Sequence, residues 1–545
     1  MQSPGPVLRS TLLAASALVC PAAAQSVGVN VLPLRAVLHD DVRLLWLGDS
    51  YSIPYEERVP GGSLLSWRID ALTAIEFGDG PNFFFVKYDV LNPAITSIDG
   101  TTGYRLFETG PDAMVRFGLP TWKLREFSTD AASATPIDLL RYRVTRTDLL
   151  PGFHGPFVSA GQTASVRTLF LDPPGAPPSL PGFTLAPVTG SPIAFDPRTE
   201  TRPKRLAGQD PEADAPAPAA DGHISASPAD LPLVADASGN LVFTLSATAP
   251  AGGTWSYAFP AGLVSYRTEK GERLPGLYFS ALADSSWSYE GFGIDTPSGT
   301  PGAITKTYSR EQLAHWLDVT TIDPAQPVFA FYLVNVEDIE PALAAQQMEA
   351  MVDQTAAAAA DAGLGPVHHC IVIPWMHRIE GQDILGRHEE QRDAAFALAL
   401  SRPDVSAVSI YDFTEGHWFT GTPESRQWLA DNGYDAFTYG SVTVDLSVDG
   451  GGASGGLLDI FRSHPQGQDA GAFFAHVIER IIVDACPADF AAPRGVLDLA
   501  DISGFLTRFL EQRPSADLAA PIGVLDLADV SAFIGSFLSG CTPNP

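Results

Sequence analysis

Short apolar runs alternate with longer amphipathic stretches over roughly half of the chain. Four of these runs predict buried strands, at 44–48 (LLWLG), 327–336 (PVFAFYLVNV), 368–375 (HHCIVIPW) and 405–413 (VSAVSIYDF). Stretches 341–363 and 389–401 carry apolar faces at helical spacing. Because strands that alternate with long helices form parallel sheets covered on both faces, we interpret 27–75 and 271–484 as one discontinuous α/β domain with three layers. Ligand sites in such sheets lie beyond the carboxyl ends of the strands.

Residues 76–270 show a different pattern, in which short runs rich in aromatic and β-branched residues are separated by turn clusters. Five such runs are 82–90, 103–109, 164–172, 240–248 and 254–260. A stretch of Pro, Ala and acidic residues at 208–223 is typical of a solvated loop. We interpret 76–270 as a β-rich domain inserted into the α/β domain.

The C-terminal part contains an internal repeat. Residues 488–510 (ADFAAPRGVLDLADISGFLTRFL) recur 28 positions later as 516–538 (ADLAAPIGVLDLADVSAFIGSFL). Each copy is a Pro/Gly loop followed by an amphipathic helix, whose apolar positions are Ile502, Phe505, Leu506 and Phe509 in the first copy and Val530, Phe533, Ile534 and Phe537 in the second. One such helix cannot bury its own apolar face, so we expect a small, separable all-α module in which the two pack about a pseudo-twofold axis.

The amino-terminal residues 1–24 have the pattern of a secretory signal. Arg9 supplies a positive charge, 11–20 is a short apolar run, and 22–24 (AAA) offers small residues at a cleavage site. No later stretch is long and apolar enough to span a membrane. Lys and Arg total 33 against 63 for Asp and Glu, a formal net charge of −30, which makes nucleic acid and anionic membrane surfaces poor partners. We therefore expect a secreted or cell-surface protein.

Cysteine usage fits export. Of the four cysteines, Cys20 leaves with the signal, whereas Cys486 and Cys541 bracket the repeats and predict a disulfide between them. Cys370 lies in an apolar run, which is typical of a buried, unreactive side chain.

Ser50 is the candidate nucleophile. It directly follows the apolar run 44–48 in the sequence Gly-Asp-Ser, which taken alone is most often a turn or a helix N-cap. Asn335 follows a second predicted strand, and His464 lies on a loop before a helix, with Asp459 five residues earlier. A serine, a carboxamide donor and a loop histidine in this order on an α/β pattern resemble the SGNH (GDSL-type) hydrolases.

The resemblance covers the two split α/β portions and implies a role for each residue. Ser50 would be the nucleophile, and its backbone N–H would serve the oxyanion hole. A second N–H would come from Gly299, with Gly293 and Gly302 as alternatives. The third oxyanion donor would be the Asn335 side chain.

The sequence departs from the family pattern in two blocks. Where the family has Gly-x-Asn-Asp, Leu333 and Val336 replace the glycine and the aspartate. Where it has Asp-x-x-His, the residue three before His464 is Phe461, so the acid is either Asp459 on a reshaped loop or absent. Two other histidines also follow strand-like runs, His377 and His417. They are alternative bases or substrate contacts.

The C-terminal repeats resemble a dockerin, the duplicated loop–helix module that docks on a cohesin. This resemblance implies carboxylate ligands for calcium at six positions, Asp489, Asp498, Asp501, Asp517, Asp526 and Asp529. The middle ligand positions hold Ala491, Pro493, Ala519 and Pro521 instead. Asp501 and Asp529 can equally be helix caps, so calcium is doubtful. The implied partner is a cohesin-like or cell-surface protein.

Together these features predict an exported serine esterase. It would hydrolyse O-acyl esters, with acetyl groups on carbohydrate as the expected substrate, through an acyl-serine intermediate and without a catalytic cofactor. The alternative is an inactive extracellular binding protein in which the β-rich insertion carries recognition.

Overall fold

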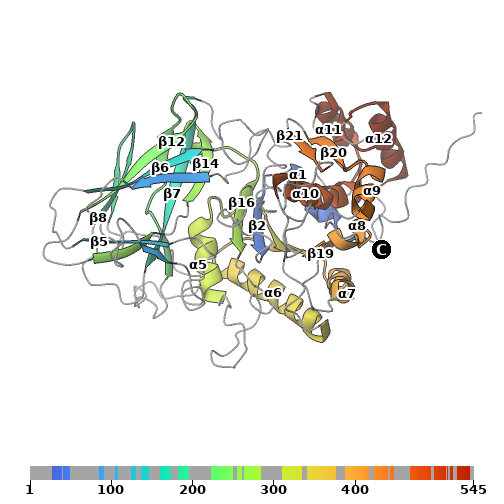
Figure 1. The fold of residues 1–545 in the computed structure, drawn as a ribbon, viewed down its shortest axis with the longest axis horizontal. Coiled ribbons are helices and arrows are strands. Elements are labelled where there is room, and N and C mark those ends of the chain that lie inside the picture. Colours follow the sequence, from blue (N-terminus) through green and yellow to red (C-terminus); the bar gives the residue numbers. More distant parts are fainter. Residues whose placement is uncertain are drawn as a thin grey trace, which may run out of the picture.

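The structure is a computed structural model, and it describes most secondary-structure elements of the chain. The described residues are 27–39, 41–48, 85–90, 105–107, 124–129, 137–145, 160–172, 182–195, 223–248, 255–259, 263–283, 310–333, 341–375, 387–416, 423–439, 442–446, 467–491, 496–510, 512, 516–519 and 524–540. They form a mixed α/β architecture, as the sequence predicts (Figure 1).

A six-stranded, mainly parallel sheet lies at the centre, in the order β1-β19-β18-β17-β2-β16. The strands are β1 Gly28–Val29, β2 Arg43–Gly48, β16 Tyr278–Ala283, β17 Val328–Leu333, β18 Val367–Ile373 and β19 Val405–Ser409. Only β1 pairs antiparallel among them, and it pairs with β19 at one edge. The four apolar runs read from the sequence are β2, β17, β18 and β19.

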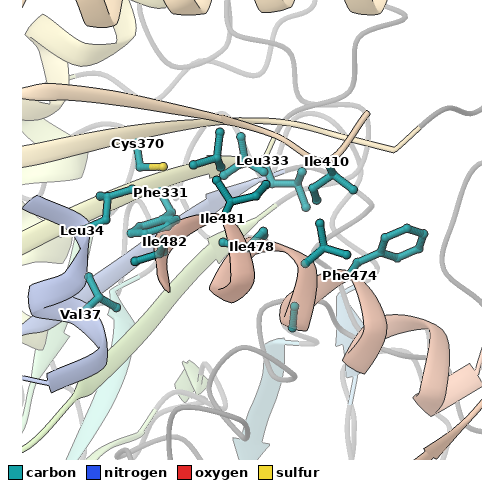
Figure 2. Close-up of a cluster of buried hydrophobic side chains, with 14 of the residues drawn as sticks. Leu34, Val37, Phe331, Leu333, Cys370, Ile410, Phe474, Ile478, Ile481 and Ile482 are labelled. Atoms are coloured by element: carbon teal, nitrogen blue, oxygen red, sulfur yellow. The ribbon is translucent and has the colours of Figure 1, made fainter. Parts of the chain in front are cut away.

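Helices cover both faces of this sheet because side chains alternate along each strand. On β2, Trp46 packs into one buried cluster with helices α1 (Arg35–His39) and α10 (Gly467–Asp484). Leu45 and Leu47 pack into a second cluster on the opposite face, with α5 (Arg310–Thr320), α6 (Pro341–Asp361) and α7 (Arg387–Ser401). Figure 2 shows Ile478 and Ile481 of α10 beside Phe331 and Leu333 of β17.

The β-rich part forms two antiparallel sheets away from the parallel one (Figure 1). One contains β15-β14-β7-β13-β5-β4, with β10 and β11 also paired to β7, and the other contains β3-β6-β12-β8-β9. The strands are β3 Phe85–Val90, β4 Arg105–Phe107, β5 Leu124–Thr129, β6 Ile137–Thr145, β7 Thr163–Asp172, β8 Gly182–Pro187, β9 Ile193–Phe195, β10 His223–Ala226, β11 Leu231–Val234, β12 Leu241–Thr248, β13 Trp255–Phe259, β14 Leu263–Glu269 and β15 Glu272–Arg273. Since β15 pairs with β14, the antiparallel sheet extends to Arg273, slightly past the boundary expected at residue 270.

A connecting segment with two short helices and a hairpin lies between β19 and α10 in the chain. It contains α8 (Ile410–Phe413), α9 (Pro423–Asp431) and the hairpin β20 (Ala436–Tyr439) and β21 (Val442–Asp445). A short 3-10 helix, Leu32–Leu34, precedes α1. No helix within the described residues is long and apolar enough to cross a membrane.

The repeats form helices α11 (Leu499–Leu510) and α12 (Leu527–Ser539). Phe505 and Phe533, which are equivalent in the two copies, stack with centroids 4.2 Å apart and planes 6° from parallel. The expected apolar faces hold in part: Leu506 and Ile534 are 48% and 49% exposed, so their assignment to the packed face is wrong. The aromatic pair belongs to a small buried cluster that also contains Ala488, Phe490 and Ala516.

Candidate active site

The predicted catalytic residues lie outside the described part of the chain. This holds for Ser50, Gly299, Asn335, Asp459 and His464. The elements that immediately flank these residues are described, and their arrangement can be compared with what the proposed chemistry needs.

Strands β2 and β17 end side by side. They pair in parallel, and the last residue of β2, Gly48, is in register with the last residue of β17, Leu333. Adjacent strands lie about 4.8 Å apart, so the chain leaves the sheet at two neighbouring points of one edge. In the sequence, Ser50 comes two residues after Gly48, and Asn335 comes two residues after Leu333.

Helix α10 begins at the same edge and runs antiparallel to the strands. In its first half, the ring of Phe474, the eighth of its 18 residues, stacks on Trp375, which follows β18, with centroids 4.3 Å apart. At its other end, the Val483 carbonyl accepts a hydrogen bond from Arg35 of α1, the helix that precedes the amino end of β2. His464 comes three residues before the first residue of α10, Gly467.

Aromatic rings surround the first turns of α10. The Tyr434 ring contacts Phe473 edge-on, with centroids 5.5 Å apart, and it stacks on Trp428 of α9, with centroids 5.9 Å apart. Phe413 at the end of α8 completes the group, 6.1 Å from Tyr434. Rings have few rotatable bonds and bury large areas, so this cluster fixes the start of α10 against the β18 and β19 ends of the sheet.

Helix α7 packs against the same edge through His388. Its Nε2 lies 3.2 Å from the carbonyl oxygen of Trp375, and its ring stacks on Tyr411 of α8. Tyr411 in turn packs closely against Gly416, which has φ of +64°. A Cβ there would lie 3.2 Å from the tyrosine ring, so glycine suits this turn on both counts. The alternative bases His377 and His417 follow Trp375 and Gly416 in the chain, and both lie outside the described residues.

Three described histidines are unsuited to accept a proton near neutral pH. Burial lowers the pKa of His368 to about 4 and that of His369 to about 3. Burial also lowers the pKa of His476, inside α10. His368 hydrogen-bonds Ser406 and His369 hydrogen-bonds the Tyr332 hydroxyl, so both have structural partners in the sheet.

Trp375 and His388 were missed by the sequence reasoning. Trp375 ends an apolar run that is typical of an ordinary strand, and His388 directly precedes the helix expected at 389–401. Both side chains are buried, at 0% and 1% exposure. One sequence feature could have indicated Trp375: it is a bulky aromatic residue directly after the proline that follows a predicted strand, in Ile373-Pro374-Trp375.

Four of the six aspartates proposed as calcium ligands accept hydrogen bonds from backbone N–H groups. One oxygen of Asp501 accepts hydrogen bonds from the backbone N–H groups of Phe490 and Ala491, both at 2.7 Å, and the other accepts from Asp498 N–H at 2.8 Å. Donors converge on this carboxylate, whereas a cation needs oxygen ligands to converge. Asp501 therefore does not fit calcium.

The second repeat repeats this arrangement. Asp529 accepts from the backbone N–H groups of Leu518, Ala519 and Asp526 at 2.7, 2.8 and 2.8 Å. Asp526 is the N-cap of α12 and Asp529 lies at its N3 position, forming a capping box. Asp498 accepts from Ala500 N–H at 2.6 Å, as Asp526 does from Ala528. Across the described residues, no group of three or more His, Cys, Asp or Glu side chains could hold a metal ion.

The remaining two predicted ligands, Asp489 and Asp517, are buried at the start of each repeat. Cys486 is disulfide-bonded, while its predicted partner Cys541 lies outside the described residues, so their pairing stays a prediction. Cys370 is a free thiol with 0% exposure, and burial raises its pKa well above the ordinary value, as expected for an unreactive side chain.

Comparisons with known proteins give structural neighbours only. No protein-family model and no curated protein matches the chain. A peptidoglycan O-acetylesterase structure is 12% identical, with 84% of this chain and 97% of that chain covered and a TM-score of 0.38. A carbohydrate acetylesterase from Xanthomonas citri is 11% identical over 60% of this chain and 73% of that one, with a TM-score of 0.21. A family two carbohydrate esterase from Cellvibrio japonicus is 6% identical over 64% and 95%, with a TM-score of 0.17.

Proposed function

We propose that the protein is an exported serine esterase of the SGNH type, with Ser50 as nucleophile and His464 as base. One observation carries this proposal: β2 and β17 end in register at Gly48 and Leu333, each two residues before a residue that the chemistry needs. Helix α10, which begins three residues after His464 in the sequence, packs at the same edge through its eighth residue, Phe474, which stacks on Trp375. Three separate parts of the chain therefore lead to one edge of the sheet.

The proposed reaction proceeds in two steps. The His464 imidazole takes the proton of the Ser50 hydroxyl as its oxygen attacks the ester carbonyl carbon, and the alcohol then leaves with that proton. Water attacks the acyl-serine, His464 takes the proton of the water and returns it to Ser50, and the carboxylic acid is released. The backbone N–H groups of Ser50 and Gly299 and the Asn335 side chain would stabilise the oxyanion in both steps.

Asp459 is the proposed acid of the triad, with a limited role. An acid in this position fixes the tautomer of the imidazole and stabilises the imidazolium, and it does not itself take the proton. A backbone carbonyl that accepts from the same ring nitrogen can do the first of these. We therefore assign Asp459 a smaller share of the rate than Ser50 or His464.

The proposed substrate is an acetyl ester on a carbohydrate or other polyol. The basis is the family resemblance and the expected export, which together favour polysaccharide over lipid esters. No cofactor takes part in these steps, because both proton transfers and the oxyanion contacts are assigned to residues of this chain.

We also propose that the C-terminal repeats bind a cohesin-like or cell-surface protein. Large apolar side chains are exposed on the repeats in four pairs spaced 28 residues apart: Val496 and Val524, Leu499 and Leu527, Leu506 and Ile534, Leu510 and Leu538. Exposed apolar residues grouped in this way mark interaction sites more often than singly scattered ones do. Their duplication offers a partner two equivalent surfaces.

The experiment that tests the esterase assignment compares two neighbouring serines. Ser50→Ala should abolish hydrolysis of a small aryl acetate with an unchanged Tm, whereas Ser52→Ala should keep most of the activity. Activity in Ser50→Ala above a few per cent would contradict the proposal. A wild-type protein inactive on all acetyl esters, which still bound polysaccharide, would favour the binding-protein alternative.

A further inference from the structure

The α/β domain holds both C-terminal repeats at equivalent positions. Arg35 of α1 donates from Nε to the Asp489 carbonyl oxygen at 2.7 Å. Arg480 of α10 donates from Nη1 to the Asp517 carbonyl oxygen at 2.5 Å. Asp489 and Asp517 are 28 residues apart, which is the period of the repeat. Two arginines on separate helices therefore bind the same backbone atom in each copy.

These two arginines also bind the last turn of α10. Arg35 is fully buried, donates to the Val483 carbonyl at 2.7 Å, and lies over the Phe490 ring at 5.7 Å. Arg480 pairs with Asp484 at 2.7 Å. A guanidinium that spans two carbonyls has its geometry fixed by both, so the start of the first repeat is held rigidly to α1 and α10.

Inside each repeat, a carboxylate closes the loop. Asp501 joins the loop start at Phe490 and Ala491 to the helix start at Asp498, across about ten residues. Asp529 does the same in the second copy. In a calcium-binding loop the cation gathers oxygen ligands from the loop and the helix. Here the carboxylate gathers N–H groups instead, and a cation would face the positive ends of those N–H dipoles.

Further contacts join the repeats to each other. The Phe505–Phe533 stack lies at the centre, with Phe490 edge-on to both rings at 5.5 and 5.9 Å. The Ser536 hydroxyl of α12 accepts from Ala488 N–H, at the start of the first copy, at 3.1 Å.

We propose that the C-terminal repeat pair is a cation-independent brace docked permanently on the α/β domain through Arg35 and Arg480. A docked repeat pair differs from the separable module expected from the sequence, because removing the repeats would uncover the buried Arg35 side chain and its carbonyl-bound guanidinium. The exposed apolar side chains of the repeats, such as Leu499 and Leu527, take no part in these contacts, so they stay accessible to a partner. The inference does not depend on the esterase proposal.

The first test measures thermal unfolding of the mature full chain with excess calcium chloride and with EDTA. We expect the same Tm in both. Asp501→Asn and Asp529→Asn should each lower the Tm by several degrees, because an amide group places N–H donors against N–H donors. Asp498→Asn and Asp526→Asn are the matched controls, since asparagine caps helices as well as aspartate does.

Two outcomes of this test would overturn the cation-independent brace. One is a calcium-dependent rise in Tm that Asp501→Asn removes, which would show a metal site. The other is an equal Tm for Asp501→Asn and Asp498→Asn, which would show that the buried Asp501 carboxylate does not stabilise the loop.

The second test asks whether the repeats unfold together with the α/β domain. Calorimetry of the mature chain should show no separate transition for the repeats, and mild proteolysis should not release them. Arg480→Gln combined with Arg35→Gln should make the repeats susceptible to proteolysis, and Arg480→Gln alone should do so in part. Arg310→Gln is the control, because Arg310 pairs with Asp361 of α6 and none of its described contacts involves the repeats. An independent transition in the wild-type protein, lost on truncation after Asp484, would contradict permanent docking.

Discussion

The two edges of the parallel sheet differ in what their residues do. At the amino edge, buried arginines and partly exposed carboxylates bind the segments through which β2 and β17 enter the sheet. At the carboxyl edge, aromatic rings hold the surrounding helices, and the chain continues into the residues proposed for catalysis. We expect amino-edge variants to change stability and spare the chemistry, whereas variants of the proposed catalytic residues at the carboxyl edge should do the reverse.

The amino edge is built around the end of α5. Arg43, the first residue of β2, donates to the hydroxyls of Thr320 and Thr321, both at 2.6 Å. Arg167 of β7 donates to the carbonyls of Val319 and Thr321 at 2.9 and 2.6 Å. One arginine from the α/β domain and one from the β-rich part thus bind the same helix end. This contact fixes how the β-rich part sits on the α/β domain.

A second group of charges lies beside it. Arg273, which ends β15, pairs with Asp41 and Asp323, before β2 and β17. Burial favours the neutral acid, but hydrogen bonds from Arg273 and Gly276 hold the pKa of Asp41 below its ordinary value. Three chain segments distant in sequence are therefore tied together where they enter the sheet.

The largest expected effect is on the carboxyl edge. His464→Ala should lower kcat/KM for an aryl acetate about 10²–10⁴-fold, the usual contribution of a general base, with an unchanged Tm. Wild-type activity should fall below about pH 6, because an unperturbed histidine has a pKa near 6.5. Asp459→Ala should lose less. Full activity in His464→Ala, with His377→Ala or His417→Ala inactive, would move the base elsewhere.

The next largest effect is on the amino edge. Arg167→Gln removes the positive charge that pairs with the partly buried Asp230 carboxylate at 2.7 Å. This loss should lower the free energy of unfolding, measured with denaturant, by about 3 kcal/mol. The folded fraction should keep its specific activity. Arg310→Gln is the control, since its pair with Asp361 is exposed and should contribute nothing measurable. Loss of activity in fully folded Arg167→Gln would break the division between the two edges.

Acid should destabilise the protein through the buried histidines of β18. The folded-state pKa values, about 4 for His368 and about 3 for His369, lie below the unfolded value near 6.5. The unfolded state therefore binds more protons below pH 6.5, and each histidine removes about 1.4 kcal/mol of stability per pH unit as the pH falls toward its folded value. Denaturant unfolding between pH 7 and 4 measures the slope, and His369→Phe should reduce it. An unchanged slope in His369→Phe would refute the assignment.

The smallest effect should come from Trp375→Phe, which keeps a ring against Phe474. We expect kcat to fall up to about tenfold through a shifted α10, with KM and the pH profile unchanged. Trp375→Ala should lower kcat further and also cost about 3 kcal/mol of stability, because it leaves a large cavity. Phe329→Leu, on the same sheet near its amino edge, is the control for packing alone. Equal kcat values in the wild type and both Trp375 variants would show that the stack positions nothing.

Much of the fold follows from local pattern, whereas contacts across the chain do not. The continuous apolar runs at 44–47 and 328–333 specify strands buried on both faces, and both are found. The period of the repeat led to the Phe505–Phe533 pair. By contrast, Arg35 and Arg167 read as surface charges, since nothing near them in sequence indicates the carbonyls they bind.

For the candidate site, local pattern again indicated only the starting point. Gly-Asp-Ser after an apolar run indicated Ser50, which stays a prediction, and the strand order places the end of β17 beside the end of β2, two residues before Ser50 in the sequence. The packing of Trp375 on Phe474 joins residues about 100 positions apart, and no local pattern encodes that distance. Asp529, expected from the sequence to be a helix cap or a calcium ligand, is the N3 residue of a capping box whose N-cap is Asp526, and only the three-dimensional loop decides which carboxylate faces which N–H.

Labelling with a fluorophosphonate tests the central claim most directly, because only an activated serine reacts with it. We predict one label per mature chain, mapped by mass spectrometry to the peptide containing Ser50, absent from Ser50→Ala and strongly reduced in His464→Ala. A label on another serine, or no label on a folded protein, would contradict the assignment of Ser50 as the nucleophile of an esterase.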